Sequence, residues 1–357
     1  MSAPPLQHRR LLAAPHRDGL PLKAMREVFW IFLLPITWVY ASYMRHRRQR
    51  SPLLKPCFKA PVPVISVGNI HVGGSGKTPI VALIAKHFEP RRVAVLSRGY
   101  GTKPLGQAQK IEATNYLPST LPDEPMWIAK TAQCPVWVHP NRALSARAAL
   151  AEGRVGVFIL DDGFQHQRLH KDIELVLINT RRPCLDYTLP LGPLREGLSS
   201  LRQATALVLV QPPQSPPSLA SFIIDWEDLL KPLGIPVFRA RRRVEGIWNA
   251  KGLVEGRLTV TAFCGIADPD GFFEDVRLVC DLEVAYRLRD HAHYSPHVLS
   301  QLLSANKKNE TTHYLTTEKD YSKAAPFFEA RGISLHYVKM GYEMESAFWS
   351  FLENAIA

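Results

Sequence analysis

The sequence predicts an α/β fold with a mostly parallel sheet, and three observations support that prediction. Short β-branched runs recur from residue 61 onward, with helical patterns between them. Several of these runs are apolar on both faces, as buried parallel strands are. The first run leads into a glycine-rich loop and then a helix start, the order of an α/β unit. Strands are expected at residues 62–67, 93–97, 136–139, 155–161, 174–179, 206–210 and 236–239, and helices at 79–88 and 142–152.

A second and shorter α/β series follows. Its strands are expected at 258–264, 282–288, 313–317 and 335–340, and its helices at 269–278 and 295–305. The proline-rich stretch 211–218 and the basic stretch 239–243 interrupt the pattern between the two series. We therefore expect a disordered tail at 1–20, a membrane-anchoring helix with a basic flank at 21–50, a core at 51–240 and a smaller C-terminal α/β lobe at 241–357.

The positive charge of the chain is concentrated near its N-terminus. Residues 1–60 hold eleven Lys/Arg and two Asp/Glu, whereas the rest of the chain holds 33 and 30. A nearly neutral body argues against nucleic-acid binding, and a local basic segment favours an anionic membrane surface as partner. The five cysteines form no CxxC pair, which argues against a zinc site. No protein partner is expected.

Residues 28–44 form an apolar run without a charged residue, followed by Arg45, Arg47, Arg48 and Arg50. As a helix this run is about 25 Å long, slightly less than the hydrocarbon thickness of a bilayer. Its Trp and Tyr residues are typical of a membrane interface, while Pro35 weakens a straight spanning helix. A spanning helix and a helix lying in the interface both fit, and a buried helix of a soluble domain is the alternative. The basic flank predicts that the body lies on the cytoplasmic side.

A phosphate-binding loop is the strongest local signal. It consists of Gly73, Gly74, Ser75, Gly76, Lys77 and Thr78, directly before a helix that opens with Pro79. Glycines let backbone N–H groups surround phosphates, Lys77 can reach the β- and γ-phosphates, and Thr78 can ligate magnesium. His71 stands where the general P-loop pattern has its first glycine. The alternative interpretation is a simple glycine-rich turn.

An apolar strand that ends in Asp161 and Asp162 is the expected magnesium-side partner of this loop. Gln165 and His166 follow on the loop at the carboxyl end of that strand, where ligand sites of α/β sheets lie. A strand that ends in Asp is common, so this motif alone is weak evidence. Its occurrence together with the glycine-rich loop strengthens the prediction of a magnesium site.

Three further clusters have both a structural and a functional interpretation. The SRGYG stretch, which holds Tyr100, is either a tight turn or a nucleotide loop. Arg195 and Glu196 are either a surface ion pair or groups that act on phosphate charge. A carboxylate coupled to an imidazole could take the proton of an attacking hydroxyl, and Asp123 and the Asp290–His291 pair are candidates for those groups.

These motifs together resemble one family, the tetraacyldisaccharide 4'-kinases, which phosphorylate a lipid A precursor in Gram-negative bacteria. The stretches that carry the resemblance are VGNIHVGGSGKTP, SRGYG, DEP, DDGFQHQRL, GPLRE, FCGIADPDGFF, RDHAHYS and LTTEKD, in this order. The resemblance implies a P-loop NTPase-like core with a smaller C-terminal lobe and an N-terminal membrane-associated helix. It also implies transfer of the ATP γ-phosphate to the 4'-hydroxyl of tetraacyldisaccharide 1-phosphate, with ATP and Mg²⁺, at the cytoplasmic face of the bacterial inner membrane.

The resemblance also implies roles for individual residues. Asp123 resembles the catalytic base and His291 its partner, while Lys77 and Arg195 act on phosphate charge. The implied metal residues are Thr78, Asp161, Asp162 and Glu196, and weaker implied contacts to nucleotide or substrate are Tyr100, Arg142, Gln165 and His166. The alternative function is a P-loop ATPase or GTPase switch, or a metallochaperone, without a lipid substrate. Such a protein needs the loop and Asp161 but neither a membrane helix nor Asp123.

Overall fold

The computed structural model describes residues 8–9, 33–49, 57–73, 76–99, 106–114, 123–181, 187–213, 226, 228–289, 292, 294–306 and 313–357. The chain forms two compact units, and each is described by itself. The larger unit comprises Gly19–Arg242 and Tyr342–Ala357, and the smaller comprises Met1–Asp18 and Arg243–Gly341.

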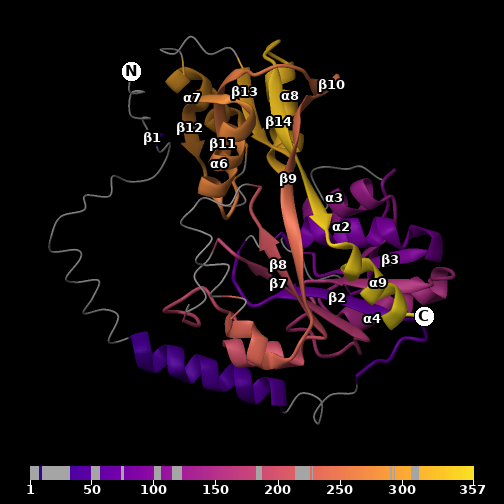
Figure 1. Cartoon of the computed structure of the whole chain (residues 1–357). Coiled ribbons are helices and arrows are strands. Elements are labelled where there is room, and N and C mark those ends of the chain that lie inside the picture. Colours follow the sequence, from indigo (N-terminus) through magenta and orange to yellow (C-terminus); the bar gives the residue numbers. More distant parts are fainter. Residues whose placement is uncertain are drawn as a thin grey trace. The chain divides into compact units, whose positions relative to one another are not determined.

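A mostly parallel sheet forms the centre of the larger unit, which confirms the predicted fold class (Figure 1). Its strand order is β9-β8-β7-β2-β6-β3-β5-β4, and β4 alone among these pairs antiparallel. The bounds are β2 (Val64–Asn69), β3 (Val93–Ser97), β4 (Gln109–Ile111), β5 (Val136–Val138), β6 (Val157–Asp161), β7 (Ile173–Asn179), β8 (Ala206–Gln211) and β9 (Val237–Asn249). Thus β2, which leads into the glycine-rich loop, lies between β6 and β7.

Helices cover both faces of this sheet, as the apolar character of the strands predicts. On one face, Ile65 and Ile159 pack with α2 (Lys77–His87), α3 (Asp123–Ala132) and α9 (Ser346–Ala355). On the other face, Val64 and Phe158 pack with α4 (Arg142–Glu152). Short 3-10 helices lie at Glu89–Arg91, Leu198–Gln203 and Lys231–Leu233.

In the smaller unit the strand order is β12-β11-β13-β14. Its elements are β10 (Gly252–Val254), β11 (Thr259–Cys264), α6 (Pro269–Val279), β12 (Asp281–Arg287), α7 (Pro296–Asn306), β13 (His313–Thr317), α8 (Glu318–Glu329) and β14 (Leu335–Met344). The four strands and two helices expected for the second series are all present, and α8 is an additional helix.

Two features near the unit boundary differ from the sequence-based expectation. The basic stretch 239–243 does not interrupt the pattern, because it continues β9: Arg239, Arg241 and Arg243 are exposed, while Phe238 and Ala240 are buried. Alternating burial is what a strand with one covered face requires. In addition, residues 342–357 pack in the larger unit, where α9 buries Phe348 and Leu352 against the core.

Residues 33–49 form a helix, the indigo helix of Figure 1. Its outer surface is apolar, with Leu34, Ile36, Trp38, Val39 and Tyr43 exposed by 48 to 73%. Within the described residues, no helix has the length and apolar character needed to cross a membrane. Of the predicted tail, the structure describes one short strand, β1 (His8–Arg9), which pairs parallel to β12. The remainder of that tail lies outside the described residues.

Candidate active site

The glycine-rich loop joins the carboxyl end of β2 to the start of α2. Gly73 and Gly76 have φ values of 93° and 75°, a left-handed conformation that favours glycine. No described side chain caps the start of α2, and its first turn holds no acidic residue. The N-terminal N–H groups of that helix are therefore suited to an anion. Gly74 and Ser75 lie outside the described residues.

His71, which departs from the general loop pattern, has a structural place. It is 1% exposed and forms an isolated antiparallel β-bridge with Leu194. Its ring packs edge-to-face with that of Trp226, with 6.2 Å between the ring centroids. The amide of Val72 also donates to Pro193 O at 2.7 Å, and that of Arg195 to Ile70 O. The segment between β2 and the glycines is thus held by backbone hydrogen bonds to the segment that carries Arg195.

Lys77, Asp162 and Arg195 form a charged cluster at the start of α2. Lys77 Nζ lies 3.4 Å from Asp162 Oδ1, and one guanidinium nitrogen of Arg195 lies 2.9 Å from both oxygens of the same carboxylate. Burial alone would raise the pKa of Asp162, but the charges of Lys77 and Arg195 and their hydrogen bonds lower it. Two cations therefore converge on one carboxylate beside the loop that is suited to phosphate.

Asp161 occupies the last position of β6, next to β2 and β3 in the sheet. Its carboxylate accepts a hydrogen bond from Ser97 Oγ at 3.0 Å. Burial raises the pKa of Asp161 to about 7, and the nearby charges of Asp162 and Glu124 add to the rise. A cation at this position would stabilise the ionised carboxylate.

Asp123 and Glu124 form the first turn of α3, and both are partly buried. Because the charge of Glu124 acts on Asp161, the start of α3 lies near the carboxyl end of β6. The structure therefore brings the Asp123 region to the same edge of the sheet as the glycine-rich loop.

Gln165 and His166 lie on the loop after β6. Gln165 donates to Asn69 O at 3.0 Å and faces Arg195 through its amide oxygen. Burial lowers the pKa of His166 to about 2, and the charge of Arg142 contributes. No described residue is in hydrogen-bond reach of the buried His166 Nε2. His166 is therefore neutral, and a ligand could use this nitrogen.

Arg142 and Glu196 are both buried. Arg142 opens α4 and donates to Pro140 O at 2.7 Å. Burial raises the pKa of Glu196, while Arg48, with which its carboxylate is ion-paired, lowers that pKa. Arg48 is the site residue to which sequence reasoning gave no role, because it appeared only as part of the basic flank. Ser97 appeared as the first residue of the SRGYG stretch, but without an individual role.

Several predicted site residues lie outside the described residues, and those that are described form no ready-made metal-binding cluster. Gly74, Ser75, Tyr100, Asp290 and His291 lie outside the described residues. Thr78 lies in the first turn of α2, beside the Lys77 cluster. In the part of the chain that the structure describes, no group of three or more His, Cys, Asp or Glu side chains could hold a metal ion.

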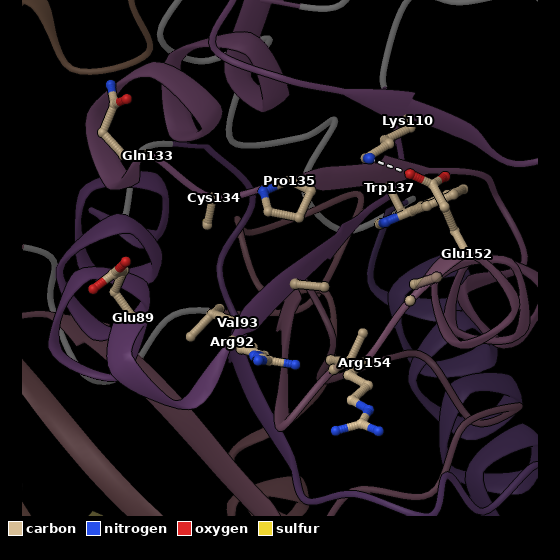
Figure 2. Close-up of a pocket in the computed structure, with 14 residues that line it drawn as sticks. Glu89, Arg92, Val93, Lys110, Gln133, Cys134, Pro135, Trp137, Glu152 and Arg154 are labelled. Atoms are coloured by element: carbon tan, nitrogen blue, oxygen red, sulfur yellow. Dashed lines mark hydrogen bonds and ion pairs between the residues drawn. The ribbon is translucent and has the colours of Figure 1, made fainter.

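A separate cavity of about 390 Å³ lies at the amino ends of strands in the larger sheet (Figure 2). Its lining includes Val93, Pro135 and Val155, which lie at the amino ends of β3, β5 and β6. None of the site residues above lines this cavity. The residues of the candidate site therefore lie at the opposite ends of the strands, the carboxyl ends.

Comparison with known proteins identifies similar chains. Residues 29–357 match the family model described as tetraacyldisaccharide-1-P 4'-kinase. A tetraacyldisaccharide 4'-kinase from Dechloromonas aromatica is 35% identical over 317 residues, which are 87% of this chain and 88% of that protein. One from Syntrophotalea carbinolica is 33% identical over 319 residues, 85% of this chain and 86% of that protein. A crystal structure of LpxK from Aquifex aeolicus in complex with ATP is 29% identical, with a TM-score of 0.69, and covers 92% of this chain and 100% of that one.

Proposed function

This chain belongs to the tetraacyldisaccharide-1-P 4'-kinase family, and we propose that it transfers phosphate at the carboxyl edge of β2, β3 and β6. The resemblance read from its motifs is confirmed. The protein is an ATP-dependent kinase that transfers the γ-phosphate to the 4'-hydroxyl of tetraacyldisaccharide 1-phosphate, a late step of lipid A biosynthesis. The observation that carries the proposed site is the convergence of Lys77 and Arg195 on Asp162 beside the glycine-rich loop.

The two cations of this cluster are the groups that would stabilise the transferring phosphate. In phosphoryl transfer, catalysis consists mainly of positioning and of neutralising charge on the phosphate oxygens. Asp162 holds Lys77 and Arg195 close together and keeps both side chains partly buried. When the phosphates of ATP lie against the loop, they supply an alternative anion for the same two cations.

Magnesium fits the residues at this edge. Mg²⁺ in phosphoryl-transfer sites takes one or two protein oxygen ligands and keeps water and phosphate as the others, so a dense carboxylate cluster is not needed. We propose that Thr78 and Asp161 hold the ion, with Asp162 at its side, and that it neutralises phosphate charge when bound. The buried carboxylate of Asp161, whose pKa is raised to about 7, supports this assignment. Glu196 was also expected at the metal, and in this structure its carboxylate pairs with Arg48.

Asp123 is proposed as the base that accepts the proton of the 4'-hydroxyl. Its place in the first turn of α3, next to a residue whose charge acts on Asp161, supports this role. His291 is proposed as its partner and lies outside the described residues. Gln165, His166, Arg142 and Tyr100 are proposed to contact nucleotide or substrate.

The helix at 33–49 is proposed to hold the enzyme on the cytoplasmic face of the inner membrane. Exposed Trp38, Val39 and Tyr43 give it an apolar outer surface, and exposed Arg45 and Arg47 follow. Apolar burial combined with basic residues is the combination that binds an anionic bilayer surface. Such a membrane contact would bring the enzyme to a lipid substrate that is itself held in the bilayer.

The proposal is tested by incubating the purified full chain with ATP, Mg²⁺ and detergent-dispersed tetraacyldisaccharide 1-phosphate. Formation of the bis-phosphorylated lipid is expected, and EDTA should abolish it. Brisk ATP hydrolysis that is independent of lipid, without a lipid product, would instead favour the nucleotide-switch interpretation.

A further inference from the structure

Arg48 belongs to the basic flank of the N-terminal helix, but its side chain does not face solvent. Arg45 and Arg47 are exposed, whereas the side chain of Arg48 is only 9% exposed. A charge on a membrane-facing surface has no reason to be buried, because burial costs hydration energy. The burial of Arg48 therefore indicates a role inside the protein.

Its guanidinium group is surrounded by partners from two loops and a 3-10 helix. It donates to the carboxylate of Glu196 and to the amide oxygen of Gln203, and to Phe164 O at 3.2 Å. The ring of Phe164 lies against its face, 3.9 Å from the guanidinium carbon. Planar geometry allows arginine to donate along its edge and stack on an aromatic ring at once, which lysine does not match.

These partners are the neighbours of the phosphate-transfer cluster. Phe164 follows Asp162 by two residues on the loop after β6, and Glu196 follows Arg195 directly. Arg48 thus ties together the two segments that supply Asp162 and Arg195. The same helix also contacts these segments through Tyr40, whose hydroxyl donates to Arg195 O at 3.1 Å.

Removing Arg48 would leave the carboxylate of Glu196 buried without its cation. A buried charge that loses its partner is strongly destabilised and tends to move toward water. Because Glu196 and Arg195 are consecutive, such a movement would displace the guanidinium that holds Asp162. Displacements of about 1 Å at a reacting centre can reduce a rate by about 10²-fold.

We propose that Arg48 is a positioning residue for phosphate transfer, which acts by holding Glu196 and the Phe164 loop against the N-terminal helix. The helix is then part of the catalytic scaffold as well as a membrane contact. The inference rests on the proposed function of the Arg195 loop in transferring phosphate. It assigns to one arginine of the basic flank a task that its exposed neighbours do not share.

The test compares Arg48→Met with Arg45→Met, which removes the same charge from the same helix. We expect kcat of Arg48→Met to fall at least about tenfold more than that of Arg45→Met, with KM for ATP within about threefold of wild type. Binding to vesicles that contain about 30% anionic lipid should weaken in Arg45→Met and change little in Arg48→Met, because only Arg45 is exposed. An equal fall in kcat for the two variants would overturn the proposal.

A double-mutant cycle tests the route through Glu196. If Arg48 acts by holding Glu196, then Arg48→Met should reduce kcat by less than about threefold in an enzyme that already carries Glu196→Gln. Full additivity of the two effects would contradict this route. If Arg48→Met does not fold, Arg48→Lys replaces it and Arg45→Lys becomes its control, because lysine keeps the charge but lacks the planar guanidinium group. A wild-type enzyme that forms no lipid product would refute the proposed function itself. Arg48 variants whose kcat equals that of wild type would refute only this inference.

Discussion

One guanidinium nitrogen of Arg195 lies 2.9 Å from both carboxylate oxygens of Asp162. Lys77 reaches the same carboxylate from the start of α2. The arrangement holds two cations beside the glycine-rich loop, where they are partly desolvated and oriented before ATP binds. Preorganised charge of this kind is a large contribution to transition-state stabilisation.

Arg195→Ala should therefore lower kcat by about 10²-fold, the typical cost of removing one preorganised donor. ATP binding should change much less, because the glycine-rich loop remains intact. Steady-state kinetics with both substrates, together with ATP titration calorimetry, separates these effects. A variant that loses ATP affinity while keeping kcat would assign Arg195 to ground-state binding.

Lys77→Ala should reduce both ATP affinity and turnover, because Lys77 directly follows the glycine-rich loop and opens α2. Lys86→Ala is the matched control: it removes an exposed lysine from the last turn of the same helix. Equal ATP dissociation constants for the two variants would show that Lys77 does not bind phosphate.

Asp123→Asn should remove most turnover and leave ATP binding intact. The amide keeps the shape of the side chain but is a far weaker base, so the 4'-hydroxyl would lose its proton acceptor. Single-turnover measurements with bound ATP check this expectation. Wild-type rates in this variant would exclude Asp123 as the base.

His166 should make the protein sensitive to mild acid. Burial lowers the pKa of His166 to about 2 in the folded state, whereas an unfolded histidine titrates near 6.5. The stabilising contribution is thus complete above about pH 6.5 and decreases as the pH falls toward the folded value. Between pH 7.5 and 5.5 the loss is about 1 kcal/mol from this residue. Urea unfolding of His166→Gln should show a smaller loss over that interval than wild type, and equal losses would contradict the assignment.

Trp38→Ser should weaken binding to anionic vesicles, because Trp38 is the most exposed of the large apolar side chains on the N-terminal helix, at 73%. Leu253→Ser is the control, since Leu253 is also exposed, at 56%, but lies on β10 in the smaller unit. Vesicle co-sedimentation of both variants measures the difference. Identical losses would show that the helix has no special role in membrane binding.

The fold was largely predictable because its strands are buried on both faces. The runs at Val93–Ser97 and His313–Thr317 form strands at the predicted bounds, since apolar β-branched residues leave little choice of environment. The prediction was wrong at residues 239–243, where clustered arginines suggested a break. Their alternation with Phe238 and Ala240 was the available signal of a strand with one exposed face.

The candidate site was predictable where chemistry follows directly from local pattern. Lys77, Asp161 and Asp162 follow strands or open a helix, so the topology of the sheet brings them to one edge. The contact between Arg48 and Glu196 was not predictable, because the two residues lie 148 positions apart and no local sequence pattern indicates their pairing. The bridge between His71 and Leu194 is non-local in the same way.

The most direct test of the account is the ratio of lipid product to ADP formed by the wild-type enzyme with saturating lipid and ATP. The account predicts one 4'-phosphorylated lipid for each ADP, and little ADP when the lipid is omitted. ADP formation that continues at the same rate without lipid, or phosphate found at a different hydroxyl, would contradict it.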